Sequence, residues 1–119
     1  MTIDEDRQTF REGVMEARAL IEAGDAAQAN AINEALTPIT ARWDSSGRLG
    51  ELLTPLLVES ESAWVRYNAA SGLLAHGYTD EAVPVLEELQ SSDTTFAGLG
   101  AERVLTTWRK ADTDGSERS

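Results

Sequence analysis

The feature that most constrains the fold of this chain is an internal repeat of about thirty residues. A proline within an apolar run occurs at Pro55 and again at Pro84, 29 positions later. A pair of apolar residues follows in each copy, Leu73-Leu74 and then Val104-Leu105, 31 positions apart. A helical unit of this length cannot bury its apolar face alone and stacks on the next unit. The repeat therefore predicts a solenoid of helix pairs.

Apolar residues recur at helical spacing along the rest of the chain, and no stretch shows sustained strand alternation. The helical stretches cover about residues 4–23, 25–43, 49–57, 62–76, 79–89 and 95–110. Pro38 predicts a kink or an early end in the second stretch, Pro55 falls inside the third, and we place Pro84 in the first turn of the fifth. The expected fold is all-α, a right-handed α-α superhelix of three antiparallel helix pairs. The first pair fits the repeat least.

Length and composition allow one folded domain. The chain has 119 residues, of which 41% are hydrophobic and 26% are charged, the proportions of an ordinary globular protein. We expect this domain to cover residues 1–110. The segment 111–119 is polar after its first residue and is expected to be a disordered tail.

The residue types present exclude several classes of site. The chain has no cysteine, so it lacks disulfides and thiolate ligands, and a reducing compartment such as the cytoplasm is expected. Its acidic N-terminus and the absence of a long apolar run predict neither a signal peptide nor a membrane span. His76 is the only histidine, which leaves histidine-based catalysis and zinc binding without a second residue. We therefore expect no catalytic residue, metal or cofactor.

The net charge of −11 indicates the kind of partner. Between Glu51 and Asp93 there are eight acidic residues and one basic residue, Arg66. Such a surface repels nucleic acids and anionic membranes. We therefore expect another protein, of basic character, as the partner.

Two large residues are predicted to be structural. Arg66 falls on the helical face that also carries Val65, Ala69 and Leu73, where a buried charge needs a partner. We expect its guanidinium to reach a carboxylate or the carbonyl groups at a helix end. Trp108 is expected in the core between the fifth and sixth helices.

The opposite arc of the same helix carries candidate binding residues. Trp64 and Tyr67 lie on what should be the solvent side, and large aromatic residues there are favoured at protein interfaces. In the alternative, the second helix or the turn before the fourth helix covers them. Together with two acidic residues of the fifth helix, the candidate partner-binding residues are Trp64, Tyr67, Asn68, Ser71, Glu87 and Glu88.

The run Trp64-Val65-Arg66-Tyr67-Asn68-Ala69-Ala70, followed by Leu73-Leu74, resembles the second helix of a HEAT repeat. In that helix a valine-arginine pair opens the helix and paired alanines let neighbouring helices approach. With residues 79–89 and the closing Leu105-Thr106-Thr107-Trp108, the chain to about Lys110 is similar to a short bacterial HEAT-like family catalogued as domain of unknown function twenty-nineteen. The resemblance implies a three-pair superhelix and a protein-binding role. Gly98 and Gly100 depart from the pattern at the start of the last helix.

These features predict a protein-binding module without enzymatic activity. The most specific form of this hypothesis is an immunity protein that neutralises a bacterial toxin through an acidic helical surface. The first alternative is a general scaffold or a regulatory subunit. The second alternative is an enzyme that uses two carboxylates, although adjacent residues such as Glu87 and Glu88 diverge by about 100° around a helix.

Overall fold

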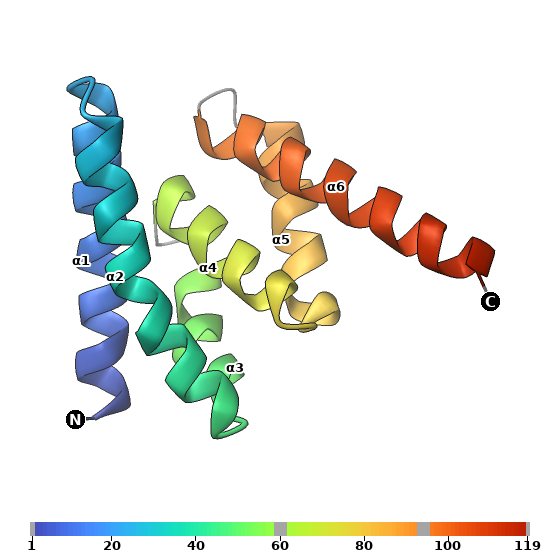
Figure 1. Cartoon of the computed structure of the whole chain (residues 1–119), viewed down its shortest axis with the longest axis horizontal. Helices are drawn as coiled ribbons and strands as arrows, with labels where there is room; N and C mark the ends of the chain where they lie inside the picture. The colour runs from blue at the N-terminus through green and yellow to red at the C-terminus, as the bar shows by residue number, and fades with distance from the viewer. Residues whose placement is uncertain (1, 59–61, 93–95, 119) are drawn as a thin grey trace.

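The computed structural model of the chain is all-helical, as the sequence predicted (Figure 1). It describes residues 2–58, 62–92 and 96–118, and the side chains of all of these except Phe96 and 111–118. No strand occurs within these ranges. The elements are α1 (Ile3–Glu22), α2 (Ala26–Ser45), α3 (Leu49–Leu53), the 3-10 helix η1 (Thr54–Leu57), α4 (Ala63–Ala75), α5 (Thr79–Ser92) and α6 (Phe96–Arg118).

Local capping signals place several helix ends where the sequence predicted them. The side chain of Asp25 accepts a hydrogen bond from the backbone N–H of Gln28 at the start of α2, and Ser62 does the same for Val65 at the start of α4. Gly24 and Gly77 follow α1 and α4 with φ of 84° and 90°. Glycine adopts this left-handed conformation without steric cost and so turns the chain at the helix end.

The three prolines have different effects on their helices. Pro38 does not end α2, which continues to Ser45, and its exposed ring leaves the lost hydrogen bond on the solvent side. Pro84 lies beyond the first turn of α5, which continues past it to bury Leu86 and Leu89. Pro55 does interrupt its helix, because α3 ends at Leu53 and η1 follows. The expected single helix over 49–57 is therefore wrong. Of the kink or early end expected at Pro38, the early end does not occur.

The last helix is longer than the sequence indicated. The backbone of α6 continues to Arg118, although the expected end was Lys110. Residues 111–118 contain no proline that would stop the helix. The side chains of 111–118, and Ser119 altogether, lie outside the described residues, so a disordered tail stays a prediction.

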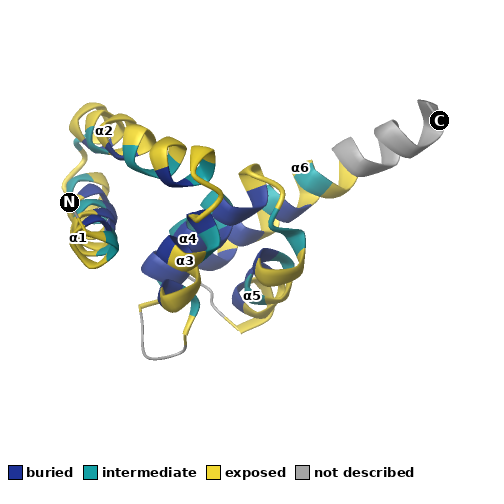
Figure 2. Cartoon of the chain, turned by 90° about the horizontal axis from the view of Figure 1, so that it is seen from below, coloured by how far each residue is buried: buried dark blue, intermediate teal, exposed yellow. Residues whose placement is uncertain are grey.

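The central element is α4, which packs against α1, α3, η1, α5 and α6. Figure 1 shows α1 and α2 as an antiparallel pair on one side of α4, with α5 and α6 on the other. Leu74 of α4 and Leu105 of α6, equivalent in the internal repeat, are both buried. Figure 2 shows the buried residues concentrated on α4 and on the elements that face it. The arrangement leaves one face of α4 to form the floor of a groove.

Candidate functional site

Arg66 makes both kinds of contact that its position predicted. It is buried, its Nε donates to the carbonyl oxygen of Leu57 at 3.1 Å, and its Nη2 lies 3.1 Å from Oε2 of Glu88. The guanidinium thereby joins the end of η1 to α4 and α5. Arg66 is thus placed as a structural residue, and Glu88 serves as its partner.

The two adjacent carboxylates of α5 pair with different arginines. While Glu88 contacts Arg66, Oε2 of Glu87 lies 3.3 Å from Nη2 of Arg109 on α6. Both members of the Glu87 pair are about half exposed, so the pair is screened by solvent and adds little stability. The arrangement does not bring Glu87 and Glu88 together as an acid and base.

Of the two alternatives for Trp64 and Tyr67, the structure favours cover, but α1 and α6 supply it in place of the second helix or the turn before the fourth. Trp64 is half-buried, and its indole Nε1 donates to the carbonyl oxygen of Val14 on α1 at 2.8 Å. The ring of Tyr67 lies 5.4 Å from that of Trp64 and presses against Gly100 of α6. A Cβ at Gly100 would lie 2.6 Å from Cζ of Tyr67, which explains the glycine at the start of α6. Helix packing thus uses both aromatic residues.

The two smaller candidates of α4, Asn68 and Ser71, lie at the edge of open space. Nδ2 of Asn68 donates to the carbonyl oxygen of Trp64 at 2.9 Å. The hydroxyl oxygen of Ser71 is buried and has no hydrogen-bond partner among the described residues. Buried polar atoms are rarely left without a partner, so this hydroxyl is an exception among the described residues.

Two hollows share Ser71 as a lining residue, and we call the two together the inner groove. The first, of about 260 Å³, lies between α2 and α4, and the second, of about 470 Å³, lies between α4 and α6. Figure 2 shows α4 between these two helices. The first is lined by Phe10, Val14, Asn33, Leu36, Thr37, Thr40, Asn68, Ser71 and Gly72. The second is lined by Ser71, Leu74, Ala75, Arg103, Val104, Thr107 and Trp108.

The inner groove differs in chemistry from the rest of the chain. Arg103 is the one charged residue among those that line it, whereas 26% of the whole sequence is charged. Its walls combine apolar side chains with the amides and hydroxyls of residues such as Asn33 and Thr37. Such a surface can bury apolar groups and can hydrogen-bond a peptide backbone without desolvating a charge.

Trp108 belongs to this groove and is not a fully buried core residue. It is half-buried against the core and lines the hollow between α4 and α6. Its indole N–H has no hydrogen-bond partner in the part of the chain that the structure describes, whereas Trp43 and Trp64 both donate. The expected position of Trp108 in the core is corrected to one in the groove wall.

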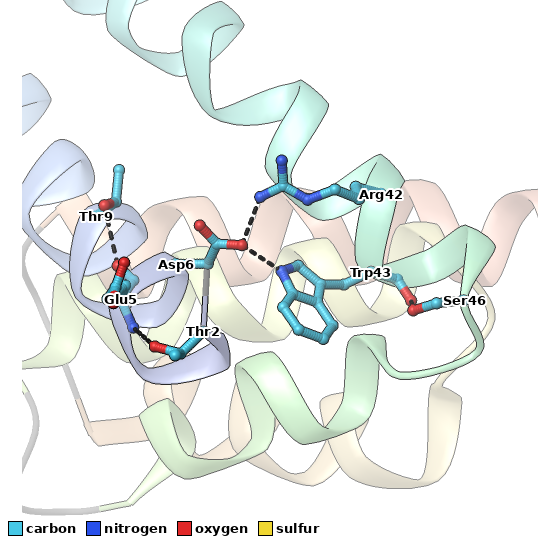
Figure 3. Close-up of polar contacts among 7 residues, drawn as sticks. All are labelled: Thr2, Glu5, Asp6, Thr9, Arg42, Trp43 and Ser46. Carbon is cyan, nitrogen blue, oxygen red and sulfur yellow. Dashed lines mark hydrogen bonds and ion pairs between the residues drawn. The ribbon is translucent and has the colours of Figure 1, made fainter.

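A buried carboxylate at the other end of the molecule was not anticipated from the sequence. Asp6 is 3% exposed, and its Oδ2 accepts hydrogen bonds from Nε1 of Trp43, at 2.7 Å, and from Nη2 of Arg42 (Figure 3). Burial by itself raises the pKa of Asp6, but these two hydrogen bonds and the charge of Arg42 outweigh it, and the pKa falls below its ordinary value. The available signal was that Asp6 shares a helical stripe with Phe10 and Val14.

Arg7 supplies the hydrogen bond that a carbonyl of α3 loses because of Pro55. Because Pro55 has no N–H, the carbonyl of Glu51 loses its usual helical donor. Nη2 of Arg7 donates to that carbonyl at 2.6 Å, and its Nε donates to the carbonyl of Leu52 at 2.8 Å. Asp6 and Arg7 thus fasten α1 to α2 and to α3. This part of the molecule is built for stability.

His76 caps α4, as expected of a residue before a glycine turn, and its Nδ1 lies 3.1 Å from Oδ2 of Asp44.

Within the described ranges no group of three or more histidine, aspartate or glutamate residues could hold a metal ion. No described helix is long and apolar enough to cross a membrane. Comparisons of the chain with models of protein families, with curated proteins and with solved structures found no match.

Proposed function

We propose that this chain is a non-enzymatic protein-binding module that holds a segment of its partner in the inner groove. The observation that carries the proposal is a pair of hollows beside α4 that share Ser71 as a lining residue. The first is lined by residues such as Asn33 and Thr37 on α2, and the second by residues such as Trp108 on α6. Depletion of charge and the presence of an aromatic residue are the features that distinguish the centre of a protein interface from the remaining surface.

We further propose that the helices form a right-handed HEAT-like superhelix, as the resemblance implied. The burial of the equivalent residues Leu74 and Leu105 and the contact from Arg66 to the preceding helix end support this architecture. In such a solenoid the second helices of the pairs line the inner surface. Most of the groove lining comes from α2, α4 and α6, the second helices in this arrangement, and α1 adds Phe10 and Val14.

In its specific form, the proposal is that the partner is a basic bacterial toxin and that this chain is its immunity protein. The net charge of −11 supports it, as do exposed acids such as Asp80, Glu81 and Glu16, which the described contacts leave unpaired. These charges would speed association with a basic surface through long-range attraction. A scaffold or regulatory subunit would use the same groove. A neighbouring gene for a toxin or a secretion component favours the immunity protein over that alternative.

A matched pair of threonines tests the groove. Thr37 lines it, Thr9 lies exposed on α1, and each hydroxyl donates to the carbonyl four residues earlier. The partner is isolated by affinity capture on the full chain, purified, and measured in a kinetic binding assay. Thr37→Arg should weaken binding about tenfold or more, mainly through faster dissociation, because it places a charge in a groove wall that the bound segment would cover.

Thr9→Arg is the control, since it makes the same change of charge outside the groove. It should alter affinity less than about threefold, and only through the association rate. Equal binding by the wild type and Thr37→Arg would rule out the groove as the site. Glu81→Lys tests the charge of the partner separately, because slower association at low salt is expected only if the partner is basic.

A further inference from the structure

Two cations of α6 differ from the other basic residues that the structure describes. The arginines at positions 7, 18, 42, 48, 66 and 109 each contact a carboxylate. Arg103 and Lys110 have no hydrogen-bond or ion-pair partner among the described residues. They are seven positions apart, which places them two turns apart on one side of the helix. In a chain of net charge −11, this edge of α6 carries two positive charges that no described carboxylate neutralises.

The same helix supplies one wall of the apolar end of the inner groove. The hollow of about 470 Å³ is bounded by Leu74 and Ala75 on α4 and by Val104 and Trp108 on α6. Its volume is within the range of sites that bury small ligands or a large side chain. Arg103 stands at its rim, and the unpartnered hydroxyl of Ser71 lies in its wall.

We propose that this hollow receives an apolar side chain from an acidic segment of the partner protein, whose carboxylates pair with Arg103 and Lys110. The inference rests on the proposed protein-binding function and specifies the segment that the groove holds. The acidic character proposed here belongs to that segment alone. The basic character proposed for the partner belongs to a different part of its surface, the part that faces α5. The amides and hydroxyls beyond Ser71, from Asn68 to Asn33, suit a peptide backbone better than the chain of a fatty acid.

Short peptides and the Trp108 indole signal provide a direct test. The probes are acetyl-Glu-Glu-Leu-Glu-Glu-amide, a second peptide with lysine at each glutamate, and a third with serine at the leucine. They are titrated into the full-length protein labelled with ¹⁵N, and the Trp108 indole resonance is assigned with Trp108→Phe. The acidic leucine peptide should shift the signals of Trp108 and of residues 71–75, and the other two should bind several-fold more weakly or not measurably.

Variants of α6 then test the rim charges. Arg103→Gln should weaken binding of the acidic leucine peptide about three- to tenfold, as expected for the loss of an exposed or half-buried charge pair. Arg109→Gln is the matched control, because it removes the same charge from the same helix at a residue that faces Glu87, and it should have little effect. The double variant Arg103→Glu with Lys110→Glu should reverse the preference toward the lysine peptide.

Three results would overturn the inference. They are equal or stronger binding of the lysine peptide to the wild type, the same affinity in Arg103→Gln as in the wild type, and a Trp108 signal that none of the peptides moves. Decanoate is titrated as a further probe, and shifts with decanoate but with no peptide would assign the hollow to an amphiphile. If the acid preference fails while Thr37→Arg still weakens partner binding, only this inference falls. If Thr37→Arg also has no effect, the proposed function falls as well.

Discussion

Two tryptophans, Trp43 near the end of α2 and Trp108 in the middle of α6, have opposite surroundings. Trp43 is 9% exposed, donates to Asp6 and has the guanidinium of Arg48 4.9 Å from its ring centre. Trp108 is half-buried beside a hollow and donates to no described residue. The same residue type therefore stabilises the fold at one end of the molecule and is available for binding at the other.

The neighbouring helices cause this difference. At the first end, α1 carries Asp6 and Arg7, whose polar groups are directed at α2 and at the interrupted helix α3. At the second end, the charged contact between α5 and α6 is the exposed pair of Glu87 and Arg109, outside the groove. Charged hydrogen bonds thus join the helices at the first end, whereas a hollow remains between α4 and α6 at the second.

The strongest test of the closed end is Asp6→Ala, which removes the acceptor of Trp43 and the buried partner of Arg42. We expect a loss of about 3 kcal/mol in the free energy of unfolding, the usual cost of leaving buried polar partners unsatisfied. Chemical denaturation measures it. Asp4→Ala is the control, since Asp4 is 85% exposed and its pair with Arg7 is worth at most about 1 kcal/mol. Equal losses in both variants would contradict the role of Asp6.

The same residue predicts a dependence on pH. Because folding lowers the pKa of Asp6, its stabilisation is fully present above the unfolded value of about 3.9 and is lost as pH falls through the folded value. The difference in unfolding free energy between the wild type and Asp6→Asn should therefore be largest near neutral pH and should shrink below about pH 4. A difference that stays constant from pH 7 to pH 3 would show that the ionised form is not the stabilising one.

Arg66 lies between the two ends and should have an intermediate effect. Arg66→Ala should cost about 1 to 3 kcal/mol, because it leaves the carbonyl of Leu57 and the carboxylate of Glu88 without a donor. Glu88→Ala should cost less than about 1 kcal/mol, since Glu88 is about half exposed and Arg66 keeps its carbonyl acceptor. Thermal or denaturant midpoints compare the two. A larger loss in the glutamate variant would show that the ion pair outweighs the carbonyl contact.

Trp108 should contribute least to stability among these residues. Trp108→Ala should cost about 1 to 2 kcal/mol, below the range of about 3 to 5 kcal/mol for a fully buried tryptophan. The same substitution should remove peptide binding at the hollow, as followed by the signals of residues 71–75. A loss of about 3 to 5 kcal/mol would instead indicate that Trp108 is a fully buried core residue, as the sequence predicted. That result would remove the contrast with Trp43.

The sequence alone determined the features that depend on interactions within one or two helical turns. These are the helical periodicity, the caps at Asp25 and Ser62, the glycine turns, and the buried position of Arg66. Side chains three or four positions apart share a helical face wherever the helix lies, so their pattern is readable before the fold is known.

Only the tertiary structure decided which neighbour each face meets. It placed α1 over Trp64, put α6 against Tyr67, directed Asp6 at Trp43 and left Trp108 beside open space. It also made Pro55 an interruption, with Arg7 at the freed carbonyl, while helices continued past Pro38 and Pro84. These outcomes depend on contacts between residues up to fifty positions apart, and a local pattern of apolar residues does not specify which helix packs opposite.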